Sequence, residues 1–101
     1  MPAVVRIGDG LSTGHFCAGS TTLGNSNTDR TVKANGIAIA VVGAPTVSHT
    51  ILVEGICVPH IAFLNEGSET VKINGIEVGR VGDSADAGEM TKGSPDVSAG
   101  D

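Results

Sequence analysis

An internal repeat built around the dipeptide Asn-Gly constrains the fold of this chain more than any other feature. Segments 31–43 and 70–82 lie 39 residues apart and match at eight of thirteen positions. Each begins with Thr-Val-Lys and carries Asn-Gly after one further residue. A two-residue type I′ turn needs positive φ at both positions, which Asn and Gly tolerate, so each segment predicts a β-hairpin.

The turn also predicts which residues face one another in the second copy. A two-residue loop at Asn74-Gly75 places Ile73 opposite Ile76 and Lys72 opposite Glu77. Alternation along the strands then puts the opposite charges on the solvent side and the aliphatic side chains beneath. The first copy follows the same design.

Partial copies of the repeat occupy the rest of the chain. Residues 4–9 align with 78–83, although only the return strand of a hairpin is present there. The phrase Gly-Ser-x-x-apolar recurs at 19–23, 67–71 and 93–97. The chain thus begins and ends within a repeat, so we expect its first and last strands to complete one another in a closed body with three pseudo-repeats. The alternative is a β-meander whose hairpins merely share turn chemistry.

Length and composition support an all-β fold that needs extra stabilisation. We expect one domain over 1–101, with no fused effector domain, and a chain of this size buries only a modest core. It has two Phe, no Trp and no Tyr, while its fifteen Gly and its many β-branched residues favour short strands and tight turns over helices.

Charge and hydropathy exclude several classes of partner and location. The net charge is −5, and no cluster of Lys or Arg is present that could neutralise a run of phosphates, so we expect no nucleic-acid partner. The first ten residues lack the features of a signal peptide, and no apolar run is long enough for a membrane span. We therefore expect synthesis in the cytoplasm.

The three histidines lie in predicted loops and suggest a metal site. Gly8-Asp9 leads to His15, Gly43-Ala44 leads to His49, and the turn Cys57-Val58-Pro59-His60 offers two ligands from one loop. Zinc prefers four tetrahedral nitrogen and sulfur ligands, so three histidines and one thiolate would form a closed structural site with no place for water.

Two alternatives remain open at this site. Each histidine can instead be an ordinary solvated side chain, and Cys17 competes with Cys57 as the sulfur ligand. In the third repeat the corresponding loop carries Gly88. We interpret the acidic residues of that loop as solvated, because their spacing does not match a calcium loop. They are Asp83, Asp86 and Glu89.

The repeated frame reads Asn-Gly-x-x-x-x-Arg-x-Gly-Asp over 74–83, follows Gly-Ser-x-x-Val, and combines with the histidine loops. In these features the chain resembles the PAAR-repeat proteins. The Pro-Ala-Ala-Arg motif that names the family is absent, and the middle copy has Val41 and Ala44 in place of Arg and Asp. The resemblance implies a small β-cone with one metal ion near its vertex, usually zinc and alternatively iron. The ligands carried over from the family are His15, His49, Cys57 and His60.

The resemblance also implies a function. Members of this family sit with their broad base on a trimeric β-helical spike in type VI secretion systems, contractile phage tails or related injection machines. The expected role is a non-enzymatic tip that helps to pierce a target envelope, touches the target membrane transiently and can carry effector proteins. Two other functions stay open: a small zinc hydrolase with water as fourth ligand, and a metal-free β adaptor for effector loading in which Cys17 and Cys57 are paired or idle.

Overall fold

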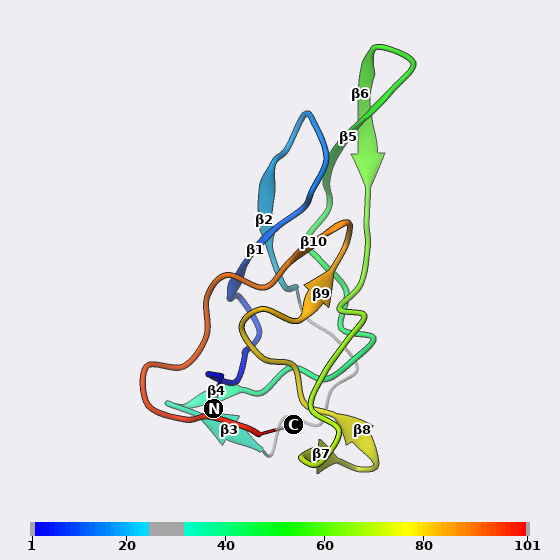
Figure 1. The fold of residues 1–101 in the computed structure, drawn as a ribbon. Helices are drawn as coiled ribbons and strands as arrows, with labels where there is room; N and C mark the ends of the chain where they lie inside the picture. The colour runs from blue at the N-terminus through cyan, green and yellow to red at the C-terminus, as the bar shows by residue number, and fades with distance from the viewer. Residues whose placement is uncertain (1, 25–31, 101) are drawn as a thin grey trace.

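The protein is built from short antiparallel hairpins. The computed structural model describes residues 2–24 and 32–100, and in these residues it contains ten strands and no helix (Figure 1). The strands pair in sequence order as β1 (Gly10–Ser12) with β2 (Ser20–Thr22), β3 (Lys33–Ala34) with β4 (Ile37–Ala38), β5 (His49–Val53) with β6 (Ile56–His60), β7 (Lys72–Ile73) with β8 (Ile76–Glu77), and β9 (Ser84–Ala85) with β10 (Gly88–Glu89). The predicted all-β class is confirmed.

The Asn-Gly turns form as predicted. Asn74 and Gly75 have φ angles of 53° and 80°, and the turn at 35–36 is alike. Lys72 pairs with Glu77 and Ile73 with Ile76, which is the predicted register. The prediction that the aliphatic side chains lie beneath the hairpin is only partly right, because Ile76 is 43% exposed.

A ring of three backbone hydrogen bonds closes the body around an approximate threefold axis. The amide of Val5 donates to the carbonyl of Gly79 (2.9 Å), Gly79 donates to Ala40 (3.0 Å), and Ala40 donates back to Val5 (3.0 Å). These residues hold the same position in the three repeats. The three pseudo-repeats therefore form a closed object, and an open meander is excluded.

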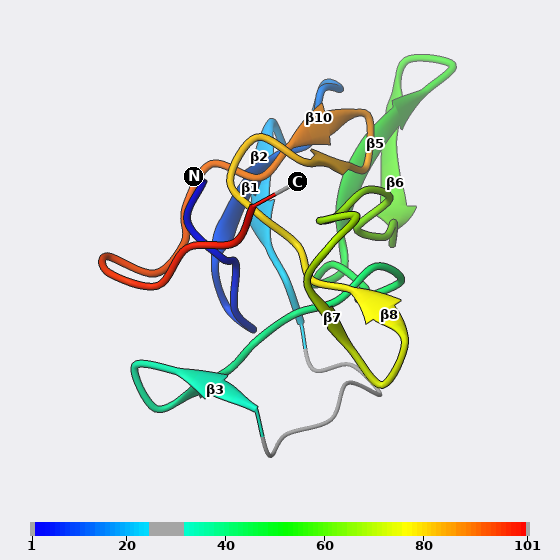
Figure 2. The same cartoon turned by 60° about the horizontal axis from the view of Figure 1, so that its bottom comes forward.

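The two termini supply the missing hairpin of this ring. The amide of Val4 donates to the carbonyl of Val97 (2.9 Å), just as Val78 donates to Val71 (3.0 Å) within the β7–β8 repeat. The first and last strands thus complete one another, as predicted. Figure 2 shows the paired termini, β3 and the β7–β8 hairpin around one end of the molecule. Segment 19–23 differs, since it runs into β2 and pairs with β1 instead of opening a repeat.

A tight turn ends the return strand of each repeat. In all three copies the amide of the fourth residue donates to the carbonyl of the first at 3.0 Å, and the third residue is a glycine with φ between 90° and 95°. The turns are 6–9, 41–44 and 80–83. Arg6 and Asp9 form an ion pair across the first, and Arg80 and Asp83 across the third, whereas the middle copy makes the same turn with apolar residues.

The side chains on the axis have complementary sizes. Val5 is fully buried, Ala40 is its smaller counterpart, and the third position is Gly79. A Cβ on Gly79 would lie 2.5 Å from Cδ2 of Leu64 and 2.7 Å from Cγ2 of Val5, closer than real atoms approach. One large, one small and one absent side chain therefore share the axis, where there is no room for a larger residue at Gly79.

The molecule is elongated, with principal extents of 40 × 23 × 22 Å. It narrows from a broad end with β3, β4, β7, β8 and the termini toward the projecting β5–β6 hairpin (Figure 1). In the described residues no helix has the length and apolar character needed to cross a membrane.

Candidate metal centre

Four potential metal ligands from three hairpins converge on one point, and His49 and His60 lie on strands instead of in the predicted loops. His15 lies in the β1–β2 loop, His49 begins β5, His60 ends β6, and Asp86 lies in the β9–β10 turn. One ligand atom of each lies within 4.8 Å of all the others. Because each hairpin follows one of the three equivalent glycine turns, the pseudo-threefold frame itself brings these side chains together.

The distances within the cluster suit a first-row metal ion. The Nε2 atoms of His15 and His49 are 3.3 Å apart, and Oδ2 of Asp86 lies 2.9 Å from the first and 2.8 Å from the second. Oδ1 of Asp86 lies 3.3 Å from Nε2 of His60. Tetrahedral zinc with bonds of about 2.0–2.1 Å separates its ligand atoms by about 3.3–3.4 Å. Small side-chain movements would therefore place all four around one ion.

The outer nitrogens of two histidines determine which nitrogen faces the cluster as a lone pair. Nδ1 of His49 lies 2.8 Å from the carbonyl of Val47, and Nδ1 of His15 lies 3.2 Å from the carbonyl of Phe16. A carbonyl only accepts, so Nδ1 of each ring donates to it, and with a cation bound at the cluster Nε2 would face the ion as a lone pair. A carbonyl partner on the outer nitrogen fixes the ring orientation that a metal ligand needs.

The charge at the cluster favours a divalent cation. Burial alone raises the pKa of Asp86, but the hydrogen bonds from His15, His49 and His60 outweigh burial, so the pKa lies below its usual value. Asp86 is therefore an anion at neutral pH. The side chains of His15, His49 and Asp86 are nearly buried, whereas that of His60 is 27% exposed and forms the solvent side of the cluster.

The His15 loop is packed directly against the Asp86 turn. Thr13 is fully buried, its hydroxyl donates to the carbonyl of Ala18 at 2.6 Å, and its own carbonyl accepts from the amide of Ala87 at 2.9 Å. Gly14, with φ of 76°, lies so close to Ala87 that a Cβ would be 2.2 Å from the Ala87 carbonyl oxygen. This backbone contact holds two of the four ligands in register.

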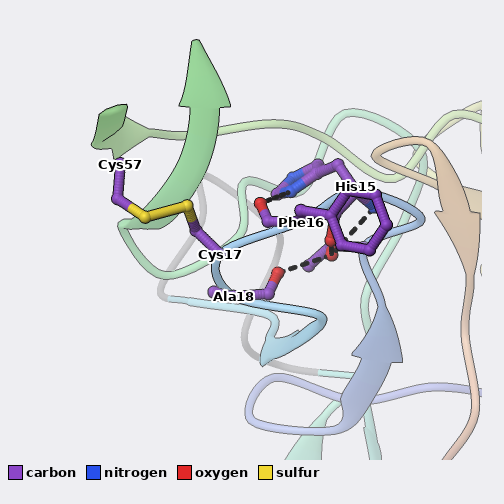
Figure 3. Close-up of a disulfide and its surroundings, with 6 residues drawn as sticks. His15, Phe16, Cys17, Ala18 and Cys57 are labelled. Carbon is purple, nitrogen blue, oxygen red and sulfur yellow. Dashed lines mark hydrogen bonds between the residues drawn. A yellow bond between two sulfur atoms is a disulfide. The ribbon is translucent and has the colours of Figure 1, made fainter. Parts of the chain in front are cut away.

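The structure brings together the three predicted histidines but corrects the sulfur ligand. Cys57 forms a disulfide with Cys17, with the two Cα atoms 5.9 Å apart (Figure 3). A sulfur bonded in this way is not the thiolate that zinc binds. The pairing instead matches one feature of the metal-free adaptor alternative, in which the two cysteines are joined.

The spacing Cys-x-x-His fails here for a geometric reason. These residues lie on strand β6, not in a turn, so Cys57 pairs with Leu52 while His60 pairs with His49. Three residues of strand separate the positions by about 10 Å. Cys57 and His60 therefore cannot bind the same ion together.

Asp86 is the ligand that sequence reasoning missed. The acidic loop was expected to be solvated, but the side chain of Asp86 is only 6% exposed, and Asp83 is buried against Arg80. Gly88 does not occupy the place of a ligand in the third repeat, because it packs against the backbone of Ser12. A usable signal was present: the third repeat should contribute a ligand from the loop after its glycine turn, and in the described residues Asp86 and Glu89 are the acidic residues of that loop that form no ion pair with an arginine.

No family model matches the chain, and no curated protein matches it.

Proposed function

We propose that this protein is a metal-stabilised, non-enzymatic tip that caps the end of a trimeric β-helical spike in a contractile injection machine and helps to pierce the target envelope. The single observation that carries this proposal is a three-part apolar surface at the broad end, on the axis of the three pseudo-repeats.

That surface is formed by one valine from each repeat. Val32, Val71 and Val97 are 38%, 40% and 36% exposed, and each accepts the equivalent backbone hydrogen bond from the strand beside it. With neighbouring residues they line a cavity of about 390 Å³, whose floor includes the buried side chains of Val4 and Val78.

A trimeric partner fits this surface better than a monomeric one. The end of a trimer presents three identical patches around an axis, and a single chain can contact all three alike only if its own surface repeats three times. Nearly equal exposure of the three valines meets that requirement. Apolar residues at the centre of a contact, with charge kept to the rim, are typical of stable interfaces.

In this proposal the metal has a structural role. One zinc ion, or alternatively iron, would be held by His15, His49, His60 and Asp86 and would tie three loops together above a small core. An ion bound tetrahedrally by all four side chains has no position for water, which argues against the zinc hydrolase alternative. Effector proteins carried as separate chains, and a transient contact with the target membrane, belong to the same proposal, as does assembly onto the spike after synthesis in the cytoplasm.

Native mass spectrometry with a trimeric β-helical spike fragment tests the proposal. We expect one chain per spike trimer, and we expect Val71→Asp to abolish that complex by placing a charge on the axis surface. The matched control is Val53→Asp, since Val53 is 47% exposed but does not line the cavity. Absence of a one-to-three complex, or equal loss with both variants, would reject the docking surface.

A further inference from the structure

We propose that the Cys17–Cys57 disulfide is a redox-sensitive link, here called the clasp, that sets the affinity of the metal centre for its ion. In the disulfide form it holds the His15 loop against the β5–β6 hairpin, and reduction releases the loop and weakens metal binding. This inference rests on the metal centre of the proposed function and adds its regulation.

The disulfide joins the two elements that supply the three histidines. Cys17 follows His15 by two residues, and Cys57 precedes His60 by three. The covalent bond therefore links the loop that provides one ligand with the hairpin that provides two, across 40 residues of sequence (Figure 3). Among the described residues there is no other cysteine.

Few contacts other than the disulfide hold the part of the β1–β2 loop that follows His15. Phe16 is 79% exposed, and Cys17 itself is exposed, so no apolar packing anchors this part of the loop. Beyond the ring contacts of His15 itself with His49 and His60, the described residues of this loop contact the hairpin through a bridge from Cys17 to Ile51, in which the amide of Ala18 donates to the carbonyl of Thr50 at 3.1 Å. The contact of Thr13 with Ala87 holds only the part of the loop that precedes His15.

The backbone at Cys17 is held in an unfavourable conformation. Its φ is 79°, in a region that residues with a Cβ rarely adopt and that persists only where surrounding contacts impose it. Once the sulfur–sulfur bond is broken, the residue is free to relax toward negative φ. Such a change displaces His15, which lies only two residues away.

The bond is also accessible to reductants. Both cysteines are exposed, and exposed disulfides are the ones that thiols reduce most easily. Two molecules of a low-molecular-weight thiol would supply the two electrons: they leave as one disulfide, and Cys17 and Cys57 become thiols. The clasp positions His15 much as an outer-shell hydrogen-bond partner positions a metal ligand. We therefore expect reduction of the disulfide to lower the affinity for zinc about 10–100-fold.

Zinc titration of the full chain against a chromophoric chelator tests the clasp. Three samples are compared: oxidised protein, protein reduced and then freed of reductant under nitrogen, and the variant Cys17→Ser/Cys57→Ser, which has no thiol that can bind the ion. We expect the reduced protein and the serine variant to bind zinc about 10–100-fold more weakly than the oxidised protein. Equal affinity of the oxidised protein and the serine variant would overturn the proposal. So would tighter binding by the reduced protein, because a thiolate would then be a ligand.

Amide hydrogen exchange without metal provides a second readout. In the serine variant we expect the amide of Ala18 to exchange at least about 10-fold faster, while that of Gly79, in the axial ring, stays unchanged. Unchanged exchange at Ala18 would overturn the clasp. Faster exchange in a protein that binds no zinc would reject the metal centre instead, so the two failures are distinguishable.

Discussion

Nε2 of His49 lies 2.8 Å from Oδ2 of Asp86, although the two residues are 37 positions apart and belong to different pseudo-repeats. The other ring nitrogen of His49 lies 2.8 Å from the backbone carbonyl of Val47, which fixes the orientation of the ring. A ring nitrogen and a carboxylate thus meet where both side chains are nearly buried. This relationship makes the cluster a candidate cation site instead of an ordinary surface histidine group, and it leads to the first prediction.

Replacing Asp86 by Asn should weaken zinc binding by at least about 10–100-fold, the range seen when even an outer-shell partner of a metal ligand is lost. The amide keeps the shape of the side chain but removes its negative charge. Affinity is measured by chelator competition. Glu89→Gln is the matched control, because Glu89 is exposed on the same hairpin, and we expect it to bind zinc like the unaltered protein. Equal affinity of the two variants would exclude Asp86 as a ligand.

Removing metal should lower thermal stability. Zinc at 100 times its dissociation constant adds about 2.7 kcal/mol to the free energy of unfolding, which corresponds to a Tm increase of roughly 10–20 °C for a domain of this size. Differential scanning calorimetry with zinc and with excess chelator measures the change. The Asp86→Asn variant should lose about half of this shift or more at the same zinc concentration. A Tm that is insensitive to chelator would contradict a structural role for the metal.

Adding a methyl group at Gly79 should destabilise the threefold axis. Gly79→Ala places an atom against Leu64 and Val5, and overpacking of this kind typically costs about 1–3 kcal/mol. Because Val5 is the large member of the axial set, the double variant Gly79→Ala/Val5→Ala should recover part of the loss. Urea unfolding measures all three proteins. Gly19→Ala, which has open space around it, serves as control and should change the free energy of unfolding little. Additive costs in the double variant would count against direct packing.

The metal-free protein should lose one stabilising contribution in acid. The pKa of Asp86 is lowered in the folded protein, because the histidine hydrogen bonds outweigh the effect of burial. A lowered carboxyl pKa contributes stability that is fully present above the unfolded value of about 3.9 and is lost as the pH falls through the lower folded value. With chelator present, the difference in unfolding free energy between the protein and Asp86→Asn should therefore shrink below about pH 4. A difference that grows toward low pH would show that the sign is wrong.

Several features of the fold were predictable because they depend on neighbouring residues. The Asn-Gly turn requires only two residues that tolerate positive φ, and a two-residue loop then sets the pairing of Lys72 with Glu77. Closure also followed from the sequence, since a hairpin divided between the termini is complete only if Val4 meets Val97. His15 and His49 were predictable because each follows a repeated glycine turn, whereas His60 was predicted from a Cys-x-x-His spacing that the structure does not use as a shared metal site.

The repeat could point to the loop after the third glycine turn, but it could not select the fourth ligand within that loop, because that choice depends on how far apart residues lie once the hairpins are assembled. The spacing of Cys57 and His60 allows a shared ion in a turn but excludes it on a strand, where three residues span about 10 Å. Tertiary packing also decided that Asp86 points inward, since the contact of Thr13 with Ala87 presses its turn against the His15 loop. The sequence by itself thus determined the hairpins, their register and the closed ring through local turn chemistry and repetition. Only the tertiary structure decided which side chains share the centre, because convergence depends on distances between segments remote in the chain.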